Sequence, residues 1–366
     1  MNKMNSEDFL HLLNNDPTEL VRKAGIKRER KHGKQITFSR NIFVPVTHQC
    51  RNRCGYCSFV SDDSNSWIFP DAFDQLLLIA KNNNCKEVLL TLGEKPEEKY
   101  QTAKDILRKL EFQTTIEYVN YLCEQALEFH LLPHSNLGLV SYKELQMLKQ
   151  TNASLGLMLE TSSIRLMNEG EAHHHSPGKN PCLRIETIEN AGKLNIPFTT
   201  GILIGIGETW MERIESIKVI ADLAKKYNHI QEVIIQNFNP QKSTPMANYP
   251  PPKEEDILFS IALAKLILPD EVSIQIPPNL NRDRVIAAIN HGANDLGGIS
   301  PVSIDYINPN LVWQEELDLS EELHQAGFSL VERLPVYPQY EKYLNTRIRE
   351  IVEEFKANEE VSTSKD

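Results

Sequence analysis

Residues 47–59 read THQCRNRCGYCSF and hold three of the six cysteines of the chain. Cys50, Cys54 and Cys57 have the spacing C-x3-C-x2-C. The apolar run IFVPV at 42–46 comes just before them and predicts a buried strand. The cysteines therefore fall on the loop at the carboxyl end of that strand. Because thiolates are soft ligands that suit iron–sulfur clusters and zinc, this loop predicts a metal centre.

Three cysteines leave one iron of a four-iron cluster without a protein ligand. An open metal position indicates chemistry rather than scaffolding, by analogy with open catalytic zinc sites. Two alternatives remain open: a structural zinc site with His48 as fourth ligand, and three unrelated thiols. An electron-transfer cluster would normally have a fourth cysteine. Cys85, Cys123 and Cys182 are scattered and offer no second C-x2-C.

Composition limits the class of protein and its partners. The chain has 366 residues, 40% of them hydrophobic, and a formal net charge of −11. So acidic a chain is not expected to bind nucleic acid or an anionic membrane. No apolar run reaches the ~18–20 residues of a membrane span, and the amino terminus lacks the apolar core of a signal peptide. Three clustered cysteines of six suit a reducing compartment, so we expect a cytoplasmic protein.

Strand and helix patterns alternate from residue 41 onward, which favours βα units and a parallel sheet. The fold class we predict is α/β, a (β/α)8-like TIM barrel, complete or partial, with N-terminal helices and a C-terminal helical extension. The expected strands are 42–47, 87–92, 131–135, 154–160, 198–204, 231–237, 272–276 and 293–298. The expected helices between them are 71–82, 115–130, 141–150, 183–195, 208–227, 253–268 and 282–291.

Four regions follow from this pattern. We expect a helical segment at 1–35, the barrel at 36–310 and an extension packed on the barrel at 311–357. The last region, 358–366, is expected to be a disordered tail.

Polar groups and glycines follow several of the expected strands, where barrel sites are built. Gly93 after the second strand would permit close backbone approach to a ligand, and Glu94 comes next. Glu160 ends the fourth strand and could accept bonds from ribose hydroxyls. Its alternative is a helix start that Thr161 or Ser162 would cap.

The loop and strand that follow carry further candidates. Of the histidines at 173–175, adjacent residues that cannot all face one point, we expect one to be buried. Arg184 can form a bidentate pair with a carboxylate, or a surface ion pair with Glu186 or Glu189. Gly205 and Gly207 precede a helix, an arrangement that resembles a phosphate-binding turn. Trp210 occupies the position where a dinucleotide-binding fingerprint needs its third glycine, which excludes a Rossmann fold.

The sixth and eighth expected strands end in polar segments. Asn237 and Asp295 are expected at the top of the barrel, and Asp295 is the candidate for contact with a sugar-alcohol or pyrimidine substrate. Gly297 and Gly298 would let backbone approach a planar ring, or else form a tight turn that closes the barrel.

The cysteine stretch, with Tyr56 before the last cysteine, resembles the signature of the radical S-adenosylmethionine (SAM) superfamily. Three longer strings, SRNIFVPVTHQCRNRCGYCSF, SPGK and ANDLGGISPV, resemble the CofG family of radical SAM enzymes, which complete the deazaflavin chromophore of coenzyme F(420). The resemblance runs from about residue 36 to about 340. At Leu92 the chain departs from the Gly-Gly-Glu element of that superfamily.

The resemblance implies one [4Fe–4S] cluster per chain and SAM as cofactors. The cluster would be held by Cys50, Cys54 and Cys57. Around SAM it implies Tyr56, Gly93, Glu94, Glu160, Arg184, Gly205 and Gly207. Lys179 would lie in a loop near the substrate and, with Asp295, is a catalytic candidate.

The activity implied is 7,8-didemethyl-8-hydroxy-5-deazariboflavin synthase, an ammonia-releasing carbon–nitrogen lyase. Its substrate would be the tyrosine–ribitylaminouracil adduct made by a CofH-type second subunit, and a low-potential donor would supply electrons. Alternatives are the CofH-type transferase itself, a menaquinone-pathway radical SAM enzyme, or, in another class, an iron–sulfur electron carrier.

Overall fold

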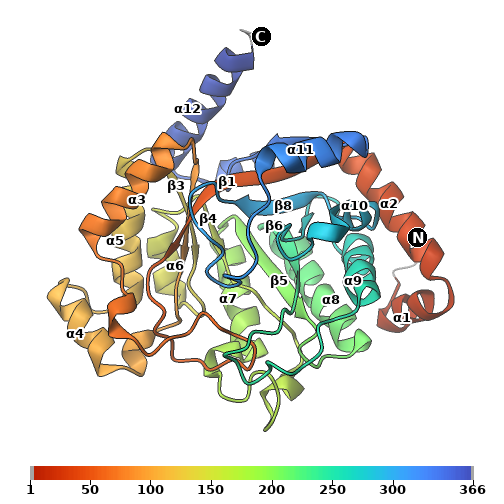
Figure 1. The fold of residues 1–366 in the computed structure, drawn as a ribbon, viewed down its shortest axis with the longest axis horizontal. Coiled ribbons are helices and arrows are strands. Elements are labelled where there is room, and N and C mark those ends of the chain that lie inside the picture. The colour runs from red at the N-terminus through yellow and green to blue at the C-terminus, as the bar shows by residue number, and fades with distance from the viewer. Residues whose placement is uncertain (1–3, 364–366) are drawn as a thin grey trace.

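The computed structural model describes residues 4–363 of the chain, with side chains up to residue 358. Eight parallel strands close into a barrel because β1 pairs with both β2 and β8. Helices surround these strands (Figure 1). The complete (β/α)8-like barrel is therefore confirmed. Its strands are β1 (Gln35–Pro45), β2 (Glu87–Thr91), β3 (Leu132–Asn136), β4 (Ser154–Gly156), β5 (Phe198–Ile204), β6 (Ile230–Asn237), β7 (Ser273–Gln275) and β8 (Asp295–Ile299).

The helices that follow the strands agree with the expected ranges to within a few residues. Capping boxes define where several of them start; at α8, for example, Thr209 and Glu212 cap each other, a contact worth about 1 kcal/mol. The α4 helix was not anticipated. These helices are α3 (Pro70–Asn82), α4 (Gln101–Lys109), α5 (Thr115–Glu128), α6 (Tyr142–Leu148), α7 (Pro181–Lys193), α8 (Trp210–Tyr227), α9 (Glu254–Ile267) and α10 (Val285–Asn290).

Strand β1 starts seven residues before the expected strand at 42–47. Its first half contains Ser39, Arg40 and Asn41, which interrupt the apolar pattern. These polar groups have partners: Ser39 donates to Glu87, and Arg40 pairs with Glu316 at 2.6 Å. The polar half of this strand can be buried because its side chains are hydrogen-bonded.

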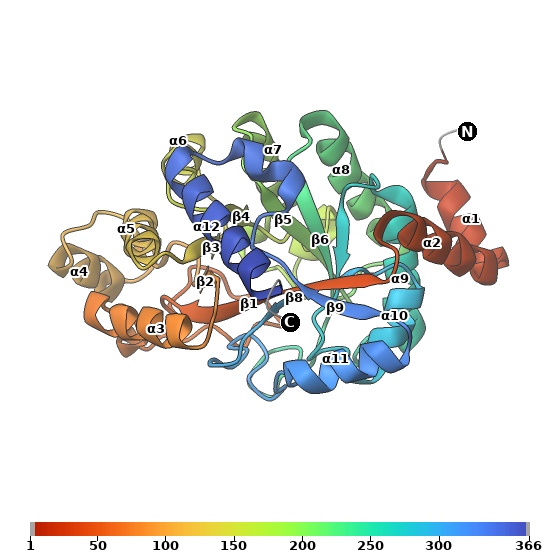
Figure 2. The ribbon, with the colours of Figure 1, turned by 90° about the horizontal axis from the view of Figure 1, so that it is seen from above.

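The C-terminal extension contributes a ninth strand to the sheet. β9 (Ser329–Glu332) pairs in parallel with the first half of β1, from Gln35 to Phe38, and the two lie side by side in Figure 2. Helix α11 (Glu316–Gln325) precedes it and α12 (Thr346–Thr363) follows. The region expected to be a disordered tail continues α12 as far as Thr363, and residues 364–366 lie outside the described residues.

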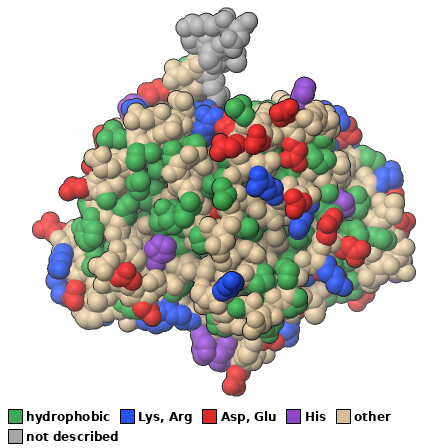
Figure 3. All heavy atoms as spheres, in the orientation of Figure 1, with side chains coloured by type: hydrophobic (Ala, Val, Ile, Leu, Met, Phe, Trp, Pro, Cys, Tyr) green, Lys and Arg blue, Asp and Glu red, His purple; other side chains and the backbone are tan. Residues whose placement is uncertain are grey.

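The N-terminal helices α1 (Ser6–Asn15) and α2 (Pro17–His32) are confirmed. They pack on the outside of the barrel against α8, α9 and α10. On the face drawn in Figure 3, Lys and Arg side chains are interspersed with Asp and Glu. None of the helices within the described residues is long and apolar enough to cross a membrane.

Candidate functional site

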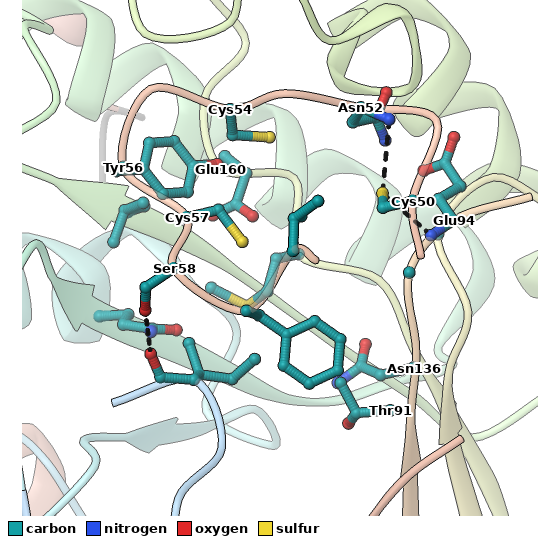
Figure 4. A pocket seen from close by; sticks show the side chains of 18 of the residues that line it. Cys50, Asn52, Cys54, Tyr56, Cys57, Ser58, Thr91, Glu94, Asn136 and Glu160 are labelled. Atoms are coloured by element: carbon teal, nitrogen blue, oxygen red, sulfur yellow. Dashed lines mark hydrogen bonds between the residues drawn. The ribbon is translucent and has the colours of Figure 1, made fainter. Parts of the chain in front are cut away.

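The cysteine loop lines a cavity of about 280 Å³ at the carboxyl ends of the strands. Residues from the ends of β2, β3 and β6 line it, including Thr91, Asn136 and Asn237. All three sequence-predicted metal ligands line the same cavity, and Figure 4 shows their side chains around a common space. Cys50 and Cys54 are buried, and Cys57 is half-buried.

Backbone amides already point at one of these sulfurs. The N–H groups of Asn52 and Glu94 donate to Cys50 Sγ over 3.4 and 3.2 Å (Figure 4). Donors of this kind stabilise a thiolate in a buried place, where charge is otherwise costly.

A second segment, residues 172–178, holds the cysteine loop from the other side; we call it the clamp segment. Its backbone accepts from Arg53 N at His175 O over 3.0 Å and from Gly55 N at Ala172 O over 2.7 Å. At its far end, the N–H of Gly178 donates to Asn52 Oδ1 over 2.8 Å. The backbone of the clamp segment therefore fixes the cysteine loop at Asn52, Arg53 and Gly55.

Two side chains of the clamp segment reach cysteine-loop residues directly. His173 Nε2 lies 3.1 Å from the hydroxyl of Tyr56, and the Ser176 hydroxyl donates to Cys54 Sγ over 3.3 Å. His173 is fully buried, and burial lowers its pKa to about 2, so the ring is neutral. One buried histidine of the three was expected, and His174 and His175 are indeed exposed.

Gly93 and Glu94 stand where the second strand meets the cysteine loop. A side chain at position 93 is impossible, because its Cβ would lie 1.9 Å from Gln49 O. Glu94 is 4% exposed, and its Oε1 accepts from Arg51 Nε over 2.8 Å. Among the described residues nothing donates a hydrogen bond to Glu94 Oε2, although Arg184 Nη2 lies 3.6 Å away.

Arg184 is buried on the wall of the cavity and donates to Gly178 O over 2.8 Å and to Met158 O. The alternative of a surface pair with Glu186 or Glu189 is therefore wrong. The alternative for Glu160, a helix start capped by Thr161 or Ser162, also fails, because only a short 3-10 turn, Ile164–Met167, follows, and no side chain caps it.

Glu160 and Lys179 form an ion pair in the cavity wall, with Lys179 Nζ 2.6 Å from Glu160 Oε1. Glu160 adopts a left-handed backbone with φ of +65°, a conformation that costs energy for a residue other than glycine. Its N–H donates to Gly201 O and its carbonyl accepts from Leu203 N, both over 3.0 Å, so β5 holds it there.

Gly205 and Gly207 form the turn after β5 and stand outside the residues that line the cavity. Both have positive φ, +93° and +107°, which explains the glycines. The carboxylate of Glu208 accepts from the N–H of Gly205 over 2.8 Å, so a protein carboxylate fills the expected anion cradle. Leu203, two residues earlier, is the part of this strand that faces the cavity.

The position of Asp295 contradicts the expectation that this residue contacts a substrate. It is the first residue of β8, and it lies at the amino end of the barrel opposite Thr37, near the start of β1. It is fully buried, and Arg333 Nε donates to its Oδ2 over 2.6 Å. Gly297 and Gly298 likewise stand outside the cavity, where a Cβ would strike Gln275 or Asn41.

The cavity also contains polar residues that sequence reasoning did not single out. Asn136 ends β3, so the strand-end rule could have found it. Asn308 and Ile307 lie on the loop after β8, for which no motif gave a signal. Ser58 fixes that loop to the cysteine loop by donating to Ile307 O over 3.2 Å. Asn237 was expected at this place, and the other uncharged polar side chains that the strand ends and the loops after β6 and β8 bring to the cavity are Thr91, Asn136, Gln236, Asn239, Gln241 and Asn308.

Comparison with known proteins places this site in a family. The model of the radical SAM superfamily matches residues 44–220. A 7,8-didemethyl-8-hydroxy-5-deazariboflavin synthase of Methanopyrus kandleri is 44% identical over 330 residues, which cover 88% of this chain and 98% of that protein. The enzyme of that name from Methanothermobacter thermautotrophicus is 48% identical over 322 residues, covering 87% and 97%. The chain belongs to this radical SAM family.

Solved structures at lower identity share the fold. Methylornithine synthase (PylB) superposes with a TM-score of 0.68 at 19% identity, covering 90% of this chain and 94% of that one. The FeFe-hydrogenase maturase HydG from Carboxydothermus hydrogenoformans gives 0.71 at 19% identity, covering 90% and 76%. Both matches extend over the barrel and support the fold class.

Membership of the radical SAM superfamily implies a [4Fe–4S] cluster and SAM, and the cysteine loop fits the cluster. The three sulfurs share one cavity, as ligands of one cluster must. Burial raises the pKa of Cys57 to about 12 and raises that of Cys50, and bound metal would reverse this by deprotonating the thiols.

The part of the cavity next to Glu94 and Arg184 fits SAM. The methionine end of SAM carries an ammonium and a carboxylate. Glu94 Oε2 is a buried acceptor that lacks a hydrogen-bond donor, and Arg184 beside it is a buried cation. Opposite charges are thus present for both ends of an amino-acid group, within one wall of the cavity.

Proposed function

We propose that this chain is a 7,8-didemethyl-8-hydroxy-5-deazariboflavin synthase that closes the deazaflavin ring of a tyrosine–ribitylaminouracil adduct with release of ammonia. Identities of 44–48% over nearly the full length of synthases of that name support the assignment. The observation that carries it is a single cavity with the cysteine loop on one wall and uncharged amides on another.

Cluster and SAM, when bound, supply the deoxyadenosyl radical that starts the reaction. The residues of the chain do the positioning. Glu94 would accept from the SAM ammonium, Arg184 would pair with its carboxylate, and Glu160 would accept from its ribose hydroxyls. Leu203 offers an apolar surface of β5 for the adenine, in place of Gly205 and Gly207, which the resemblance put around SAM. Tyr56 fixes the cysteine loop through His173.

The amides suit the adduct because its uracil ring and ribityl chain present many neutral donors and acceptors. Asn237 is held by Asn281, which donates to its Oδ1 over 3.1 Å, so that amide is oriented in advance. Lys179 lines the cavity, where it is paired with Glu160, and remains our catalytic candidate as a group that can donate a proton. Asp295 has no part in this assignment.

Two partners follow from this reaction. A CofH-type subunit must supply the adduct, and a low-potential donor must reduce the cluster. A carbon–nitrogen bond of the adduct breaks and its nitrogen leaves as ammonia, which makes the enzyme a carbon–nitrogen lyase.

The test is anaerobic turnover by the reconstituted protein with SAM, a reductant and the preformed adduct. We expect a fluorescent deazaflavin and ammonia in equal amounts, identified by mass spectrometry. The matched control is the Cys54→Ala protein. With free tyrosine and the ribitylaminouracil, the wild-type protein should form no adduct. Adduct formation from those two compounds would assign the chain to the reaction of the CofH-type partner instead.

A further inference from the structure

The clamp segment places a hydroxyl against one cysteine of the loop. Ser176 is fully buried, and its Oγ lies 3.3 Å from Cys54 Sγ. Its backbone is fixed on both sides, since Ser176 N donates to His173 O over 3.0 Å and Ser176 O accepts from Lys179 N over 2.8 Å. The hydroxyl is therefore held beside the sulfur rather than free to turn to water.

The direction of this hydrogen bond follows from the chemistry of the sulfur. A metal-bound cysteine is a thiolate, which can only accept, so the Ser176 hydroxyl must donate. No other described side chain donates to Cys54 Sγ. Cys50 differs, because its two donors are backbone N–H groups that a substitution does not remove.

We propose that the Ser176 hydroxyl raises the reduction potential of the cluster bound at Cys50, Cys54 and Cys57. This rests on the proposed function only in requiring that the cluster be there. Reduction by one electron adds negative charge that is shared with the cysteine sulfurs. A donor to a sulfur stabilises the reduced form more than the oxidised form, and hydrogen bonds to sulfur are among the factors that set such potentials.

Burial strengthens this effect. With Ser176, Cys54 and His173 all buried, water cannot replace a lost donor without a rearrangement. Ser176 is accordingly a positioning and tuning residue, and it need not touch SAM or the substrate. It sets how readily the electron donor can load the site.

The experiment is an anaerobic redox titration of the full-length, reconstituted protein without SAM, followed by electron paramagnetic resonance of the reduced cluster. In Ser176→Ala we expect the equilibrium constant for one-electron reduction to fall about tenfold, which is a midpoint about 59 mV more negative. Ser176→Thr keeps the hydroxyl and should restore the wild-type midpoint. Ser61→Ala is the matched control, because the Ser61 hydroxyl accepts from Asp63 N and serves no cysteine.

Iron and sulfide contents accompany each titration. A Ser176→Ala protein with a full cluster and the wild-type midpoint would overturn the inference. So would a variant that folds but holds no cluster, since the hydroxyl would then serve assembly rather than potential. If Ser176→Ala does not fold, Ser176→Gly, which also lacks the hydroxyl, decides: a midpoint more negative than that of the wild type supports the inference, and the wild-type midpoint overturns it. Wild-type protein that binds no cluster would instead overturn the proposed function.

Discussion

The two ends of the barrel use buried polar residues in opposite ways. At the amino end, Arg333 donates to Asp295 over 2.6 Å and to Glu232 over 2.7 Å, and Tyr337 donates to Asp295 over 2.8 Å. At the carboxyl end, the thiols and Glu94 Oε2 face a cavity. One end satisfies its buried charges with protein groups, and the other keeps acceptors for a ligand.

This difference separates stability from function within one set of strands. Arg333 and Tyr337 come from the C-terminal extension, which thereby closes the amino end of the barrel. Both carboxylate oxygens of Asp295 accept from protein groups, so it has no free acceptor for a ligand, whereas Glu94 keeps one. Substitutions at the two ends should therefore have separable effects, on folding at one and on cofactor binding at the other.

The largest expected effect is at the cysteines. Cys54→Ala should abolish deazaflavin formation and deplete cluster iron, while the unfolding free energy of the metal-free protein changes by no more than the loss of one small buried group, about 1 kcal/mol. Iron analysis, absorbance and turnover check this. Asp295→Asn, at the other end, should lower stability but leave iron binding by the folded protein intact. Loss of the cluster in Asp295→Asn would break the comparison.

At the amino end, Arg333→Met should destabilise the protein by about 3–5 kcal/mol, because Asp295 would be left as a buried charge without its partner and Glu232 would lose a hydrogen-bond donor. Denaturant unfolding of the metal-free protein measures this. Arg347→Met is the matched control: Arg347 pairs with Glu124 and Glu128 but is 41% exposed, so its loss should cost less than about 1 kcal/mol. Equal losses in the two variants would contradict a special role for the buried network.

Sequence patterns predicted the carboxyl end of the barrel better than the amino end. The cysteines, Gly93 and Glu160 follow strands whose apolar runs are unambiguous, so the rule that barrel sites follow strands placed them correctly. The prediction that Asp295 meets a substrate was wrong because β8 is short and glycine-rich, so the sequence did not show where this strand starts and where it ends. Because Asp295 stands at the amino end of its strand, it belongs to the buried network of Arg333 and Tyr337 and not to the cavity.

Non-local pairing explains the other misses. The polar half of β1 is a strand only because Glu87 and Glu316, far along the chain, satisfy Ser39 and Arg40. β9 is four residues long and only partly buried, and it is defined by its pairing with β1. Local sequence patterns predict the barrel and its cysteine site. They do not predict these pairings between segments that are far apart in the chain.

A smaller effect is expected where the cavity meets SAM. Glu160→Gln keeps the shape of the side chain but removes the charge, so SAM binding should weaken by about 1.5–3 kcal/mol, the worth of hydrogen bonds to a charged group. Equilibrium dialysis of SAM with the reconstituted protein measures this. Glu171→Gln is the control, since Glu171 pairs with Arg165 outside the cavity. Unchanged SAM affinity in Glu160→Gln would remove Glu160 from the proposed site.

The last prediction concerns one group at the amino end of the barrel, Glu232, and the pH dependence of stability. Burial raises the pKa of Glu232 from 4.5 to about 7, against the attraction of Arg333. Between those values the folded state holds a proton that the unfolded state releases, so this contribution to stability is full below about pH 4.5 and is lost as the pH rises through 7. Its slope is at most about 1.4 kcal/mol per pH unit.

Other buried groups work in different directions, so the test is a difference between two proteins. Burial lowers the pKa of His134 to about 3, which makes stability rise with pH below its unfolded value of 6.5. Subtracting the unfolding free energy of Glu232→Gln from that of the wild type at each pH cancels such terms. The difference should fall steadily between pH 4.5 and 7. A difference that stays flat would show that Arg333 keeps Glu232 ionised throughout. The amino end of the barrel would then hold two full negative charges, on Asp295 and Glu232, beside Arg333.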